Sequence, residues 1–167
     1  MIPVKTALVL ITALVLQVSL VARFSLDGAR GDLLLLVALS AAVAEGPEKG
    51  AIVGFAAGVT FDLVLNTPFG LSALVYCVMG FVVGWFQGSV LRVSWWMPVV
   101  SVILGSVLGV VLYALAGVVL DQASLSGPPL PTIVVAVSVL NGLLAPLTTK
   151  LMRWALADTS QRHLMPR

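Results

Sequence analysis

Charged residues are scarce in this chain. Lys, Arg, Asp and Glu together make up 10% of its 167 residues, whereas hydrophobic residues make up 60%. The mean hydropathy is +1.13. A soluble domain is normally about one quarter charged because its surface must be hydrated. The composition therefore excludes a water-soluble globular protein and predicts an all-α integral membrane protein with a single membrane domain.

Groups that carry out chemistry are also rare. The single cysteine, Cys77, excludes a disulfide framework and a cysteine metal site, and it lies in an apolar run where a thiol serves as a small hydrophobic group. The single histidine is His163, close to the end of the chain. No phosphate-binding loop, zinc-protease motif or nucleophile elbow occurs. An enzyme is therefore disfavoured, and we expect no catalytic residue, cofactor or metal.

What the chain does contain is a series of apolar segments. A helix needs roughly 20 apolar residues to cross the hydrocarbon core of a membrane. Six candidate spans are separated by polar or Pro- and Gly-rich connections, and a short polar tail follows at 153–167. The spans are residues 4–24, 33–44, 51–65, 69–86, 97–120 and 132–151. The first lacks a small-residue cleavage site and further spans follow it, so we expect a retained helix and not a cleaved signal peptide.

The second and third spans are shorter than a standard crossing. The polar stretch at 45–50 separates them, and a second one begins at Asn66. The two segments can form either a re-entrant hairpin or two compact, packed helices. Polar stop signals at both ends favour packed helices.

The orientation of the chain follows from its lysines and arginines. With six spans, both termini share one side with the second and fourth connections. That side carries seven basic residues, namely Lys5, Lys49, Arg92, Lys150, Arg153, Arg162 and Arg167, against Arg23 and Arg30 on the other. Because basic residues concentrate on the cytoplasmic side, the sequence predicts cytoplasmic termini. The pI of about 9.0 thus bears on topology and does not indicate nucleic-acid binding.

Small residues recur at intervals of four in the third span. A carboxylate and an amide continue the series, which runs through Gly50, Gly54, Gly58, Asp62 and Asn66. The same spacing returns in the next two spans, at Gly80 and Gly84 and at Gly105 and Gly109. Residues four apart lie on one ridge of a helix, and small residues there let two backbones approach closely. The pattern predicts close helix packing.

Two polar residues and one proline inside the spans bear on how the helices pack. Asp62 lies toward the outer end of the third span, and it is either an interfacial carboxylate in contact with water or a buried contact that locks this helix to a neighbour. In the last span, Pro146 frees the carbonyl of Gly142 and favours a kink. Asn141 can form a hydrogen bond to another helix, so we expect it to be structural.

These residues also support a resemblance. The stretch Gly54-x-x-x-Gly58-x-x-x-Asp62-Leu63, then Pro68-x-Gly70-Leu71-x-Ala73-Leu74 and Gly80 and Gly84, resembles the MreD family, the small membrane component of the bacterial rod-shape system. Chain length, six spans, a short basic tail and Asn141 followed by Ala145-Pro146 are similar too. The likeness covers nearly the whole chain, although the stretch from Gly54 to Gly84 is the distinctive part.

The resemblance implies a fold and a set of partners. The fold would be a compact six-helix bundle similar to the substrate-binding component of energy-coupling-factor transporters. The chain would be a scaffold in the bacterial inner membrane that binds MreC and acts with MreB, RodA and a class B penicillin-binding protein in peptidoglycan synthesis. The family provides no enzymatic residue to transfer. The alternative is a small-solute-binding subunit of a transporter, for which Asp62, Asn66 and Tyr113 are the available polar groups.

The predicted topology can be tested by cysteine labelling. In a Cys77→Ser background, Ser126→Cys lies in the connection expected outside the cell and Ser160→Cys lies in the cytoplasmic tail. An impermeant thiol reagent applied to whole cells should label the first position and spare the second. The reverse pattern would rule out six spans with cytoplasmic termini.

Overall fold

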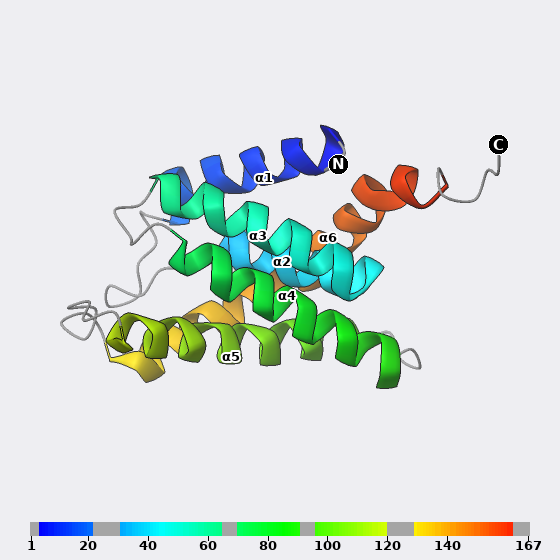
Figure 1. Cartoon of the computed structure of the whole chain (residues 1–167). Helices are drawn as coiled ribbons and strands as arrows, with labels where there is room; N and C mark the ends of the chain where they lie inside the picture. Colours follow the sequence, from blue (N-terminus) through cyan, green and yellow to red (C-terminus); the bar gives the residue numbers. More distant parts are fainter. Residues whose placement is uncertain (1–3, 22–30, 65–69, 91–95, 120–128, 162–167) are drawn as a thin grey trace.

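The computed structural model describes residues 4–21, 31–64, 70–90, 96–119 and 129–161. These residues form six α-helices, as the sequence predicts, and the first helix continues as a short π-helical segment. The elements are α1 Val4–Leu16, η1 Gln17–Val21, α2 Leu33–Glu45, α3 Pro47–Val64, α4 Leu71–Val90, α5 Met97–Val119 and α6 Leu130–Gln161. The helices run back and forth, so the start of α1 and the end of α6 lie at the same end of the bundle (Figure 1).

Two of the described helices are long and apolar enough to cross a membrane. They are Met97–Val119 and Leu130–Leu156. Shorter apolar helices occupy Val4–Ser19, Leu33–Glu45 and Leu71–Gln87. Length and apolar composition thus indicate a membrane protein, most directly for α5 and α6.

Three boundaries differ from the sequence prediction. The polar stretch at 45–50 is not a loop, because the chain reverses at Gly46, with φ +92°, and α3 already begins at Pro47. Proline is favoured in the first turn of a helix, where its missing N–H costs nothing. Helix α4 continues to Val90, beyond the expected end at residue 86. Helix α6 continues to Gln161, so much of the expected tail is helical.

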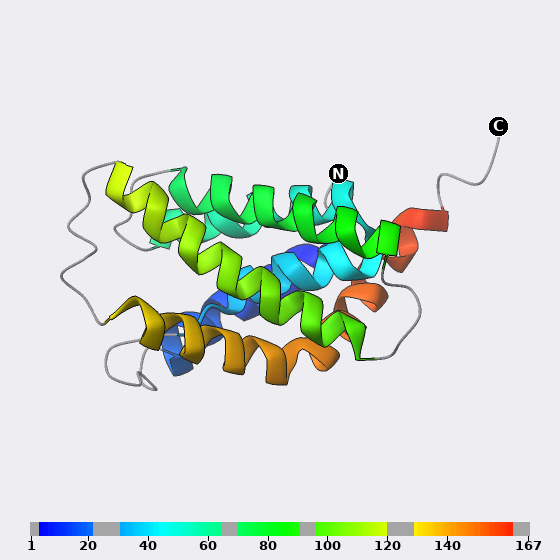
Figure 2. The same ribbon diagram turned by 90° about the horizontal axis from the view of Figure 1, so that it is seen from below.

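The core of the bundle is α2. Ten consecutive residues of this 13-residue helix, from Leu34 to Val43, are buried, and α2 contacts each of the other five α-helices. Figure 2 shows α2 (light blue) enclosed among its neighbours. A helix that is hydrophobic on all sides belongs in a core. At about 20 Å, α2 is short for a membrane crossing, but other helices surround it. It packs antiparallel to α3, so the two segments form two packed helices.

Helices α3 and α4 meet backbone to backbone. A methyl group added at Gly54 would collide with the carbonyl of Tyr76, and one at Gly58 with the backbone of Ala73. At Gly50 the added carbon would lie 2.6 Å from the carbonyl oxygen of Gly80. A methyl at Gly84, in turn, would lie 2.6 Å from the carbonyl carbon of Gly46. The glycine stripes of the third and fourth spans therefore form one contact, which we call the glycine seam.

The glycines of α5 pack differently. A methyl group at Gly105 would lie 2.9 Å from side-chain carbons of Leu39 and Val83, and one at Gly109 would lie 3.1 Å from a side-chain carbon of Leu35. These glycines accommodate side chains of α2 and α4 and do not bring two backbones together. A flexible side chain can move aside, whereas a backbone cannot.

This contrast predicts unequal costs for the same substitution. Gly58→Ala should destabilise the protein by about 1–3 kcal/mol, the usual cost of overpacking, because its methyl group meets the backbone of α4. Gly109→Ala serves as the matched control and should cost clearly less, since Leu35 can shift. Thermal unfolding of both variants in detergent measures the difference. Equal stability of the two variants would contradict a rigid glycine seam.

Candidate functional site

Asp62 lies on α3 and caps the start of the following helix, α4. Its carboxylate accepts hydrogen bonds from three backbone N–H groups at the start of α4, at 2.9 Å from Gly70, 3.3 Å from Ser72 and 3.3 Å from Ala73. The first N–H groups of a helix lack intrahelical partners, and a side-chain oxygen there normally comes from the preceding residue. Gly70 precedes α4 and has no side chain, so Asp62 supplies that oxygen from α3.

The burial of Asp62 distinguishes an interfacial carboxylate in contact with water from a buried contact between helices. The residue is only 5% exposed, so it is a buried contact between α3 and α4 and not a carboxylate in water. A negative charge at a helix N-terminus is also stabilised by the helix dipole. Gly70 has φ +99°, a left-handed conformation that favours glycine. The connection between α3 and α4 thus depends on the carboxylate of Asp62 and on the backbone conformation of Gly70.

A second carboxylate at the same end joins α2 to α4. The side chain of Asp32 precedes α2 and accepts a hydrogen bond from the backbone N–H of Leu35 at 2.9 Å. Its other oxygen accepts a hydrogen bond from the hydroxyl of Tyr76, which lies on α4. Burial raises the pKa of the Asp32 carboxyl, and these hydrogen bonds act in the opposite direction. The ring of Phe61 meets the Tyr76 ring edge to face, with centroids 6.0 Å apart.

Gln17 attaches the first helix to this arrangement. Its side-chain amide nitrogen donates to the carbonyl of Gly31 at 2.7 Å, and its amide oxygen accepts from the backbone N–H of Leu33 at 2.8 Å. We call the group of Gln17, Asp32, Asp62 and Tyr76 the capped end. Its side chains link η1, α2, α3 and α4 by hydrogen bonds to the backbone at the starts of α2 and α4 and by the bond between Asp32 and Tyr76. These residues therefore position helices.

Other polar contacts lie farther along the bundle. The amide nitrogen of Asn141 on α6 donates to the hydroxyl of Ser106 on α5 at 2.9 Å, which is an interhelical contact of the expected kind. Ser40 and Thr148 join α2 to α6 at 2.8 Å. Pro146 lies within α6, and the last turns of the helix (orange to red) bend away from its first part in both ribbon views (Figures 1 and 2).

Two of the candidate residues are not placed. Asn66 and Pro68 lie outside the described residues. The glycines at 50, 54, 58, 80 and 84 come together in the glycine seam, while Gly105 and Gly109 contact α2. Asn141 and Pro146 lie on α6, apart from the capped end. The placed candidates therefore fall into four groups: the glycine seam, the α5 glycines, the two α6 residues, and Asp62 with Gly70 at the capped end.

Sequence reasoning missed Gln17, Asp32 and Tyr76. Asp32 precedes an apolar run, which is an ordinary N-cap signal and could have identified it. Gln17 interrupts an otherwise apolar first span and could have been singled out on that ground. Nothing in the sequence relates Tyr76 to Asp32, because 44 positions separate them.

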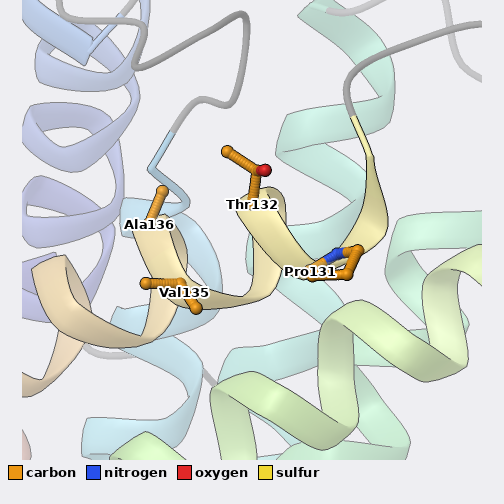
Figure 3. Close-up of a pocket in the computed structure, with 4 residues that line it drawn as sticks. All are labelled: Pro131, Thr132, Val135 and Ala136. Atoms are coloured by element: carbon orange, nitrogen blue, oxygen red, sulfur yellow. The ribbon is translucent and has the colours of Figure 1, made fainter.

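A hollow opens at the start of α6. Its volume is about 350 Å³, and Pro131, Thr132, Val135 and Ala136 line it. Figure 3 shows a single side-chain oxygen among these four residues, the Thr132 hydroxyl. Small-molecule sites combine apolar walls with several converging polar groups, and neither Asp62 nor Tyr113 lines this hollow. In the described part of the chain, no three His, Cys, Asp or Glu residues come close enough to hold a metal ion.

Comparison with known proteins identifies the family. The family model described as rod shape-determining protein MreD matches residues 2–155 of the 167-residue chain. No curated protein and no solved structure matches the chain. The family match includes the glycine seam and both carboxylates of the capped end. The chain therefore belongs to the MreD family of rod shape-determining proteins.

Proposed function

We propose that this protein is a non-enzymatic membrane scaffold of the bacterial cell-shape machinery. It binds an MreC-like membrane protein and supports peptidoglycan synthesis along the cell cylinder, in a larger complex with MreB, RodA and a class B penicillin-binding protein. The observation that carries the proposal is the MreD family match over residues 2–155.

The described polar side chains support a scaffold. Asp62 bonds to the start of α4, and Asp32 and Gln17 bond to the start of α2 and the backbone just before it. These groups fix where helices begin and how they pack. A scaffold needs such fixed geometry because its partner recognises a helix arrangement, and interfaces that are already organised lose less entropy on binding.

The proposed topology has six crossings, with both termini in the cytoplasm of a bacterial cell. The alternating helix directions and the shared position of the first and last helix ends support it (Figure 1). So does the location of described cations, because Lys5 and Lys49 lie in the first turns of α1 and α3, and Lys150 and Arg153 lie in the part of α6 that follows Pro146. The proposed likeness to the transporter component is one of helix number and compact packing.

A solute-binding subunit of a transporter remains the alternative for testing. It would use polar groups near the outer end of the bundle, and the hollow at the start of α6 provides one hydroxyl. Asp62 would then contact a solute in place of, or in addition to, the backbone of α4. The two functions predict different losses for one substitution.

Asp62→Ala separates these functions. The variant should still reach the membrane, because one carboxylate is a small part of a chain that is 60% hydrophobic. It removes the acceptor of the N–H groups at the start of α4, at a cost of about 0.5–2 kcal/mol, the usual effect of replacing an N-cap carboxylate by alanine. Recovery of an MreC-like partner by affinity purification, with partners identified by mass spectrometry, should fall, and cells that depend on the variant should lose their rod shape.

Asp62→Asn is the matched control. It keeps one acceptor oxygen for the start of α4, so partner recovery at equal membrane levels should lie between the wild type and Asp62→Ala. If Asp62→Ala keeps its partner and the rod shape but abolishes uptake of a small solute, the scaffold is wrong and the transporter subunit replaces it.

A further inference from the structure

Helix α6 is longer than a membrane crossing requires. Its 32 residues extend about 48 Å at 1.5 Å per residue, against a hydrocarbon thickness of about 30 Å. Pro146 cannot donate a hydrogen bond to the carbonyl of Gly142, which permits a bend at this point. The final turns leave the direction of the first part of the helix (Figures 1 and 2). We call residues 147–161 the post-proline segment.

The post-proline segment has two different faces. Met152, Ala155 and Leu156 are buried, with exposed fractions of 0%, 0% and 2%. Lys150, Leu151, Arg153 and Trp154 are exposed. One face therefore holds the segment against the bundle, while the other presents two cations beside apolar and aromatic groups. Basic, aromatic and aliphatic side chains on one face are typical of a helix at a membrane interface.

The first helix contributes a third cation. The ammonium group of Lys5 on α1 lies 4.9 Å from the centroid of the Trp154 ring, in a cation–π contact. This contact joins the start of α1 to the post-proline segment. We call the group of Lys5, Lys150, Arg153 and Trp154 the basic seam.

We propose that the basic seam binds the headgroup of an anionic phospholipid. Lys and Arg side chains near the membrane surface attract anionic lipids and interact favourably with their phosphate oxygens. An exposed apolar track leads along α6 to the seam, through Leu143, Leu147 and Leu151 at intervals of four residues. A phospholipid has both parts in the same order, with acyl chains along the leucines and a charged headgroup at the cations.

The apolar track favours a lipid over an acidic protein segment. The exposed fractions are 76% for Leu143 and 67% for Leu147. A soluble acidic segment could neutralise the cations but would leave these leucines uncovered. An anionic phospholipid covers the leucines and neutralises the cations together.

Trp154 provides a local probe for this lipid. The other three tryptophans are replaced by Trp85→Phe, Trp95→Phe and Trp96→Phe, so that all indole fluorescence comes from Trp154. The protein is reconstituted in phosphatidylcholine vesicles with an equal minor fraction of brominated phosphatidylglycerol or brominated phosphatidylcholine. Bromine quenches indole at close range. We expect several-fold stronger quenching by the anionic lipid, declining with added salt.

Charge variants assign the preference to the seam. Lys150→Gln with Arg153→Gln should bring the two lipids close to equal quenching, because removal of each cation lowers the preference by up to about fivefold. Lys49→Gln is the control at the same end of the bundle and should keep the preference, since Lys49 pairs with Glu45 at 2.8 Å. Unchanged thermal unfolding shows that each variant is folded.

Two results would overturn the proposal. Equal quenching by both lipids in the unsubstituted seam at low salt would show that no anionic phospholipid is selected there, and would favour an acidic protein segment. A preference that survives the double substitution in folded protein would place the lipid elsewhere.

Discussion

The structure depends on hydrogen-bond acceptors for the backbone N–H groups at helix starts that are shielded from water. An unpaired buried donor costs about 1–3 kcal/mol, so each helix start inside the bundle needs an acceptor. Asp32 supplies it for α2 from the adjacent position, and Asp62 supplies it for α4 from a different helix. The hydrogen bonds of Asp62 therefore fix α3 relative to α4 at one end. The glycine seam then determines how closely the two helices approach along the rest of their length.

The glycine seam and the hydrogen bonds of Asp62 to the start of α4 depend on each other. Three hydrogen bonds to one carboxylate require the end of α3 to lie close to the start of α4. A side chain larger than hydrogen at Gly58 would separate the backbones beside that corner. Small residues in membrane helices stabilise association by van der Waals contact, since lipid is as apolar as the helix surface. Asp62 thus sets where α4 begins relative to α3, and the glycines set how closely the two helices approach.

Much of this fold could be predicted from the sequence. Apolar segments gave the six helices, and the interval of four gave the glycine seam, because both signals are local and periodic. Helix ends were harder to predict. The polar residues at 45–50 and 153–161 indicate a loop and a tail, but α3 begins at Pro47, and the buried side chains of Met152, Ala155 and Leu156 hold the end of α6 against the bundle. The capped end depends on pairs such as Asp32 and Tyr76, whose proximity only the folded chain determines.

The central position of α2 has a consequence for the order of synthesis. Helix α2 is made early, yet its enclosure includes contacts with α6, the last helix, among them the hydrogen bond between Ser40 and Thr148 across 108 positions. Such distant contacts form late, because most of the chain must be present first. A nascent chain therefore holds a partly uncovered core until its final helix enters the membrane. Until α6 packs, Ser40 lacks its hydrogen bond to Thr148, and the flank of α2 that faces α6 stays uncovered.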